Sequence, residues 1–270
     1  MRFATLAFLL VLTAVAHAAE LKQPTIDAFN RYLQATEQRF NNELRPGTAF
    51  LHIDSLAPAD RQAASDRLRR GEIVISRLDT LENGKKVHVP DAMVHHWIGT
   101  VFIPGATLQQ TLALAEDYNH HSVYYAPEVV RSKITSRNGD DFHIYYRFKH
   151  HKVVTVVLDT EYDIHYTRVS PTREISRSYS TRVQEVENAG ESDEKDKPIG
   201  NDTGFLWRLD TLWRFEQKDG GTYVQCEAIS LTRDIPTGLG WMIRPFIESV
   251  PRESLEFTLA NTRKALVGNR

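Results

Sequence analysis

The second half of the chain is a series of stretches in which apolar and polar residues alternate, followed by one long segment with an apolar helical face. A period of two predicts β-strands with one buried face. Turn signals such as Asn138-Gly139 and Asp219-Gly220-Gly221 separate neighbouring stretches and predict antiparallel pairing. A sheet that curls and is closed by a single C-terminal helix encloses a space. The predicted fold class is therefore α+β.

The stretches that we interpret as strands cover residues 72–78, 94–103, 129–136, 141–148, 153–167, 173–186, 205–215 and 223–232. Thr107 is a suitable N-cap for a short helix after the second of these. Residues 188–204 are polar, acidic and contain Gly and Pro, which predicts an exposed, mobile loop. Pro245 and Pro251 are expected to interrupt the C-terminal segment, with Pro251 in the first turn of a final helix that runs to Val267.

Residues 1–19 predict a cleavable export signal. Arg2 supplies a positive start, and Phe3 to Val15 form an apolar run that is too short to span a bilayer. Ala16-His17-Ala18 has the small residues that a signal peptidase reads, so cleavage is expected after Ala18 or Ala19. The expected location is the periplasm or the outside of the cell, and the sequence leaves these two open.

Residues 20–86 predict a helical extension that precedes the main domain at 87–270. Apolar residues recur there at helical spacing, as in Ile26, Phe29 and Leu33, and a second, polar helix is expected at 59–70. No other stretch reaches about 18 apolar residues, which argues against a stable membrane span.

This order of elements resembles the helix-grip (SRPBCC) superfamily, which includes the START domains, the birch-pollen-allergen-like proteins and bacterial polyketide cyclases and aromatases. The closing stretch SLTRDIPTGLGWMIRPFIESVPRESLEFTLANTRKAL is similar to the end of many exported bacterial members. The resemblance covers roughly residues 87–267. It implies a curved antiparallel sheet wrapped around a long C-terminal helix, with a hydrophobic cavity that holds a lipid, sterol, polyketide or plant hormone. It implies no universal catalytic residue.

Alternation also predicts which side chains share a face. Arg177 shares its parity with Ile175 and Tyr179, and Glu227 shares its parity with Ile229. A charge on an inward face needs a partner or a polar ligand group. We therefore expect Arg177 and Glu227 to contact the polar end of a ligand or to pair across the cavity.

The other candidate ligand-binding residues are one further cation and five aromatic side chains, namely Arg233, Tyr162, Tyr179, Trp207, Trp213 and Trp241. Trp241 is expected at the mouth of the pocket. Two purely structural alternatives stay open. A register shift of one residue would place the charged side chains in solvent, and the aromatic side chains could fill the core without binding a ligand.

The sequence lacks the motifs of several functional classes. The eleven histidines include adjacent pairs, but neighbouring strand residues point to opposite faces, so we expect no metal site. The sequence has neither a G-x-S-x-G elbow nor a phosphate-binding loop, so we expect no nucleotide cofactor. The net charge of −2 argues against nucleic acid as a partner. Cys226, the only cysteine, is expected to be a small buried residue.

Three functions fit these observations. The first is an exported carrier that binds an apolar small molecule or lipid in its interior. The second is a cyclase-like or hydrolytic enzyme that uses polar cavity residues, and the third is an envelope interaction protein with a filled core. A pocket below about 300 Å³ would favour the third function. The oligomeric state stays open.

Overall fold

The computed structural model describes residues 19–82, 84–151, 155–234 and 240–268, with residues 240–247 described by their backbone alone. The helices are α2 (Gln23–Glu43), η1 (His52–Ser55), α3 (Pro58–Arg69), α4 (Leu108–Ala115), η2 (Tyr118–His120), α5 (His121–Tyr124) and α6 (Gly240–Val267). The long strands are β5 (Ala92–Pro104), β6 (Val129–Asn138), β7 (Asp141–His151), β8 (Thr155–Ser170), β9 (Arg173–Glu187), β12 (Arg208–Lys218) and β13 (Gly221–Arg233). The short strands are β1 (Ala19–Glu20), β2 (Val74–Arg77), β3 (Leu81–Glu82), β4 (Lys85–Lys86), β10 (Lys195–Asp196) and β11 (Asn201–Asp202).

One antiparallel sheet organises the described residues. Its strands follow the order β2-β5-β13-β12-β9-β8-β7-β6, and β10 pairs with β9 outside this path. The hairpins β6–β7, β7–β8, β8–β9 and β12–β13 join strands that follow one another in sequence. The α+β class and the helix-grip arrangement are thereby confirmed, because a single long helix packs against this sheet at the C-terminus.

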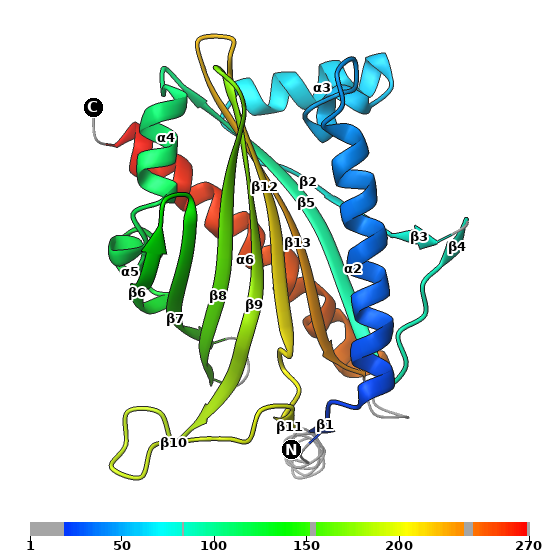
Figure 1. The fold of residues 1–270 in the computed structure, drawn as a ribbon, viewed down its shortest axis with the longest axis vertical. Coiled ribbons are helices and arrows are strands. Elements are labelled where there is room, and N and C mark those ends of the chain that lie inside the picture. The colour runs from blue at the N-terminus through cyan, green and yellow to red at the C-terminus, as the bar shows by residue number, and fades with distance from the viewer. Residues whose placement is uncertain (1–18, 83, 152–154, 235–239, 269–270) are drawn as a thin grey trace, which may run out of the picture.

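Helices cover both faces of the sheet. In Figure 1, α2 crosses in front of the sheet and α6 lies diagonally behind it. We call the two sides the α2 face, which includes Ile229 and Leu231, and the α6 face, which includes Val224 and Cys226. Successive residues of β13 alternate between the two, as strand geometry requires. Cys226 is buried, as predicted.

Helix α6 approaches β5 very closely at Gly99. A Cβ atom at that position would lie 2.6 Å from Leu259 Cδ1 and 3.2 Å from Leu255 Cδ2. Only glycine allows this contact, because real Cβ atoms do not approach other atoms so closely. The glycine therefore fixes how near the helix lies to this side of the sheet.

Two sequence predictions need correction. Helix α6 runs without a break from Gly240 to Val267, so Pro251 lies inside one long helix and does not start a new one. A proline costs a helix one backbone hydrogen bond, and packing of the apolar stripe on the sheet offsets that loss. Residues 188–204 are mostly exposed, as predicted, but they are not a loop throughout, because β10 pairs with β9 and β11 pairs with β1.

Residues 20–86 lie directly on the sheet. Strand β2 extends the sheet by pairing with β5, and α2 packs across the α2 face through Phe29, Tyr32 and Phe40. The predicted export signal up to Ala18 lies outside the described residues. None of the helices in the described part of the chain is both long enough and apolar enough to cross a membrane.

Candidate functional site

The α6 face carries a cluster of aromatic side chains opposite the last helix. The hydroxyls of Tyr118 and Tyr166 lie 2.7 Å apart, and His121 Nδ1 lies 2.5 Å from the Tyr146 hydroxyl. The hydroxyl of Tyr125 lies 3.0 Å from Thr262 Oγ1, which joins the cluster to α6. These aromatic groups come from η2, α5 and the strands β7 and β8, so elements distant in sequence meet at one point.

Tyr162 is the exception within this cluster. Its side chain is only 4% exposed, and its hydroxyl has no hydrogen-bond partner among the described residues. Burial raises the pKa of the Tyr162 phenol, with Thr160 acting in the opposite direction. A buried hydroxyl without a partner costs about 1–3 kcal/mol. The α6 face therefore contains a polar group that a ligand atom would satisfy.

Burial also controls the ionisation of the cluster. It lowers the pKa of His121 to about 4 and raises the pKa of Tyr125 to about 12. Desolvation disfavours the charged form of each group, so at neutral pH these side chains carry no charge. The aromatic cluster around His121 and Tyr125 is therefore uncharged.

Helix α6 does not contact all strands of the α6 face equally. Helix α6 makes its closest backbone approach to β5 and β13, and also contacts α4 and α5. Opposite the more distant strands the sheet carries small buried side chains, since Ser176 and Ser178 pair with Tyr166 and Ile164 on the same face. Large aromatic side chains and small serines alternate there.

A pocket of about 280 Å³ opens at the rim of this region. Its lining residues come from the α5–β6 connection, the end of β7 and helix α6, namely Pro127, Glu128, Lys149, His150, His151 and Phe257. The volume falls just below the range typical of small-molecule sites, about 300–1,000 Å³.

The α2 face has the opposite character, because charged and polar groups are buried there. Glu227 is 0% exposed in its side chain, and its Oε1 accepts hydrogen bonds from Arg39 and, at 2.6 Å, from His96 Nε2. The Tyr32 hydroxyl lies 2.8 Å from His96 Nδ1. Burial by itself raises the pKa of Glu227, but the hydrogen bond and charge of His96 and the charges of Arg39 and Arg214 lower it overall.

Arg214 extends this polar cluster towards the end of α2. It donates at 2.5 Å to the Glu43 carboxylate and at 2.5 Å to the Phe50 carbonyl. The backbone N–H of His52 donates at 2.7 Å to Gln225 Oε1. Helix α2 and η1 are thus held to the sheet by buried hydrogen bonds as well as by apolar packing.

The predicted site residues divide between these two faces. Tyr162 and Trp213 belong to the α6 face, as expected, with the Trp213 ring stacked on Phe215. Arg177 and Glu227 share a face with Ile175 and Ile229, as the alternation predicted, but α2 covers that face, so these two side chains do not lie between the sheet and α6.

Three further candidates also lie away from the α6 face. The Tyr179 hydroxyl donates at 2.5 Å to Glu37 of α2. Trp207 packs in the α2-face core, and its indole N–H donates at 3.1 Å to Asp202. Strand β12 begins one residue later, at Arg208, so the alternation of that strand does not extend back to Trp207. Arg233 donates at 3.2 Å to the Thr203 carbonyl, beside Gly204. The side chain of Trp241 lies outside the described residues.

Sequence reasoning missed the partners that α2 supplies. Arg39 and Glu43 are four residues apart and form an ion pair on one face of α2, a spacing that the sequence displays. Their contacts to β12 and β13 span more than 170 residues of chain, and no local pattern predicts such pairs. Among the described residues, no group of three or more His, Cys, Asp or Glu side chains is placed to hold a metal ion.

Comparisons with known proteins give likeness of structure alone. Neither a family model nor a curated protein matches the sequence. A STAR-related lipid transfer protein from Xanthomonas axonopodis is 15% identical at a TM-score of 0.43, covering 72% of this chain and 98% of that chain. The Zhui aromatase/cyclase from a Streptomyces species is 11% identical at a TM-score of 0.44, covering 65% and 94%. Human STARD10 is 9% identical at a TM-score of 0.45, covering 82% and 84%. At these values the function must be argued from the chain's own residues.

Proposed function

We propose that this protein binds an apolar small molecule or lipid between the α6 face of the sheet and helix α6. The observation that carries the proposal is the buried Tyr162 hydroxyl, which has no partner among the described residues although the Tyr162 ring packs against Tyr146 in the apolar core. A ligand with a long apolar body and one polar atom fits this environment. The apolar body would displace water at about 25 cal/mol per Å² of buried area, and Tyr162 would orient the polar atom.

The proposal predicts that filling the space blocks binding. Ser178 is a small buried residue on the α6 face, so Ser178→Leu would occupy ligand volume. We expect a fluorescent fatty acid to bind the natural protein saturably and to lose at least tenfold in affinity with Ser178→Leu. Ser192→Leu, in an exposed loop, is the matched control and should bind like the natural protein. Equal binding by all three proteins, or binding by none, would contradict the proposal.

A filled core without a ligand is the second candidate function. The pocket at the rim is only about 280 Å³, which favours a protein that acts through its surface. The two functions differ in what purifies with the protein. Mass spectrometry of protein prepared without detergent should reveal a bound lipid under the first function, and protein free of lipid supports the second.

We also propose that the chain is exported and cleaved after Ala18 or Ala19. Strand β1 begins at Ala19, and the N–H of Leu21 donates at 2.7 Å to the Gly200 carbonyl, so a cut at this point leaves the new N-terminus bound to β11. Expression of the full sequence in a Gram-negative bacterium tests this proposal. The periplasmic protein should begin at Ala19 or Glu20, and intact protein starting at Met1 would contradict the proposal.

A further inference from the structure

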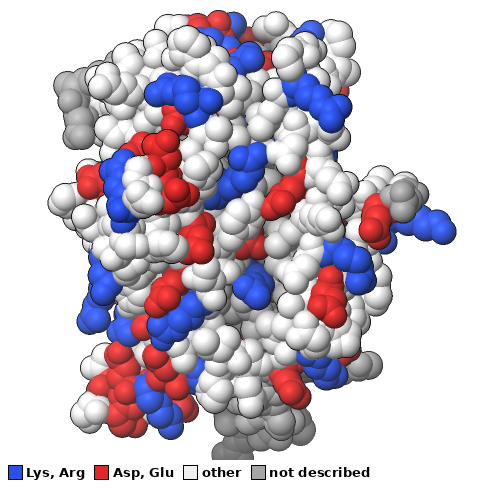
Figure 2. All heavy atoms as spheres, in the orientation of Figure 1, with Lys and Arg blue, Asp and Glu red and all other residues white. Residues whose placement is uncertain are grey.

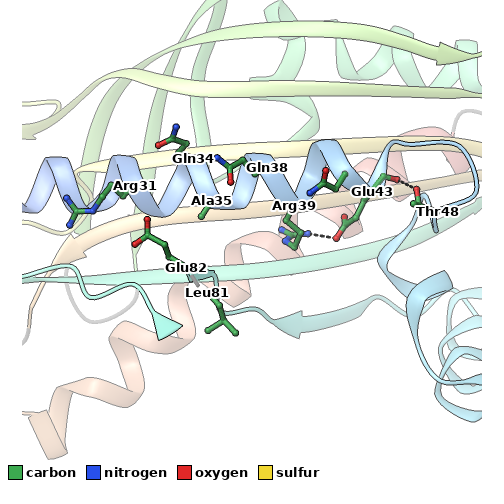
Figure 3. A pocket seen from close by; sticks show the side chains of 10 residues that line it. Arg31, Gln34, Ala35, Gln38, Arg39, Glu43, Thr48, Leu81 and Glu82 are labelled. Atoms are coloured by element: carbon green, nitrogen blue, oxygen red, sulfur yellow. Dashed lines mark hydrogen bonds and ion pairs between the residues drawn. The ribbon is translucent and has the colours of Figure 1, made fainter. Parts of the chain in front are cut away.

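A groove of about 570 Å³ runs along α2 on the side of the molecule opposite α6. Figure 3 shows its two flanks: side chains of α2 along one, and Leu81 and Glu82 of β3 along the other. The α2 flank carries three amides, Gln34, Gln38 and Asn42. Residues that are three or four apart lie on one side of a helix, so the amides form a continuous row.

The charges in the groove balance. Arg31 and Arg39 are offset by Glu43 and Glu82, and the Arg39–Glu43 pair is already closed at 2.9 Å. Figure 2, in the same orientation as Figure 1, likewise shows both signs of charge interspersed on this side of the molecule. Amide side chains both donate and accept hydrogen bonds. The groove therefore suits a neutral ligand that has many hydrogen-bonding groups.

The floor of the groove is connected to the buried polar cluster. Arg39 is 36% exposed in its side chain and reaches the fully buried Glu227, while Glu43 bonds to the buried Arg214. Three atoms of this cluster have no hydrogen-bond partner among the described residues: Arg214 Nε, Gln225 Nε2 and Glu227 Oε2. Arg214 and Gln225 are direct cross-strand partners, and Glu227 follows on the same face of β13.

The chemistry of these three atoms restricts which ligand group can be their hydrogen-bond partner. Two of them are donors and one is a carboxylate acceptor. A carboxylate or phosphate would meet Glu227 with like charge, and an ammonium group could not accept from Arg214 or Gln225. A hydroxyl group both accepts and donates, so its chemistry matches both kinds of atom, although Arg214, Gln225 and Glu227 do not themselves line the groove.

We propose that the groove is a second binding site and that it takes a neutral polyhydroxylated ligand, a sugar or polyol. The amide row binds the hydroxyls of the ligand, and Arg39 and Glu43, which hold the buried cluster, add charged hydrogen-bonding groups to the same groove. This site lies on the α2 face and does not depend on a ligand between the sheet and α6.

Titration calorimetry with maltose, cellobiose, trehalose and glycerol tests the proposal. We expect at least one of these probes to bind saturably, and we expect Gln38→Ala and Asn42→Ala each to weaken that binding at least fivefold. Gln62→Ala is the matched control, because Gln62 is an exposed glutamine on α3, away from the groove, and its side chain donates to Asp66 in its own helix. This variant should bind like the natural protein.

Three outcomes would overturn the proposal. The first is no saturable heat with any probe, and the second is equal binding by the Gln38 and Asn42 variants and the natural protein. The third is binding of an unrelated extended peptide, but of no sugar, that the same two variants abolish. Circular dichroism of each variant must match the natural protein, since these side chains line a surface groove and are not required for folding.

Discussion

The two faces of the sheet are stabilised by different physical means. On the α6 face, aromatic and aliphatic groups pack around one partnerless hydroxyl, and burial keeps the titratable groups neutral. On the α2 face, buried ionised groups pair with one another around Glu227, although Arg214 Nε, Gln225 Nε2 and Glu227 Oε2 have no hydrogen-bond partner among the described residues. An uncharged, partly unsatisfied face is suited to receiving an apolar ligand. A face held by interlocking charges is suited to keeping α2 in place.

The largest expected effect comes from breaking the α2-face network. Glu227→Ala would leave Arg39, His96 and Arg214 without their shared carboxylate, so the free energy of unfolding should fall by about 3–5 kcal/mol. Urea denaturation at pH 7 measures the change. Glu191→Ala, in an exposed loop, should change stability by less than about 0.5 kcal/mol. A fall of less than about 1 kcal/mol in the free energy of unfolding of Glu227→Ala would contradict the stabilising role of these ion pairs.

The next effect is the pH dependence that the α6 face imposes. The pKa of His121 is about 4 in the folded protein against 6.5 for the ordinary group, so the unfolded chain binds more protons between these values. Stability is therefore lost as the pH falls from about 6.5 to 4, by roughly 3 kcal/mol for this residue. His121→Gln should remove that part of the slope in urea titrations at pH 7, 5.5 and 4.

The exposed His151 supplies the control for this pH experiment. His151→Gln should leave the slope unchanged. Glu227, whose pKa is lowered, acts in a different window: its contribution is complete above the ordinary carboxyl pKa of 4.5 and is lost only below it. A His121→Gln variant with the natural slope would mean that the imidazole is hydrated in solution.

A smaller effect is expected where α6 touches the sheet. Gly99→Ala places a methyl group 2.6 Å from Leu259 Cδ1, and overpacking of this kind costs about 1–3 kcal/mol. The double variant with Leu259→Ala removes the clashing atom, so Gly99→Ala should cost less than about 0.5 kcal/mol in that background. Additive costs in the double-mutant cycle would place α6 further from β5 than the structure does.

The smallest expected effects on stability come from removing the hydroxyls of two tyrosines, one on each face. Tyr162→Phe removes a partnerless hydroxyl, so the free protein should be unchanged or up to about 1 kcal/mol more stable, while fatty-acid affinity falls roughly tenfold. Tyr179→Phe removes a hydroxyl that donates to Glu37, so it should cost about 1 kcal/mol and leave fatty-acid affinity unchanged. If Tyr179→Phe lowered fatty-acid affinity and Tyr162→Phe did not, the ligand would bind on the α2 face and not on the α6 face.

Local patterns were enough to predict most of the fold. The alternation in β8 and β13 correctly indicated which side chains lie together, and Thr107 does cap α4. Alternation does not indicate which face is which, however, when helices cover both. Glu227 and Ile229 were therefore grouped correctly, but the sequence did not show that α2, and not the C-terminal helix, covers their face. The partners of Glu227 come from α2 and β5, more than 130 residues away in sequence, so the polar cluster could not be predicted.

The most direct test of where an apolar ligand binds is covalent labelling with a diazirine-bearing fatty acid, followed by peptide mapping. The account predicts light-dependent labels on the α6 face, within β8, β9 and β12 around Tyr162, Ser178 and Trp213, and on α6 itself. Excess unlabelled fatty acid should suppress these labels. Labels confined to α2 and the strand residues beneath it, or no labelling above that of the denatured protein, would contradict the account.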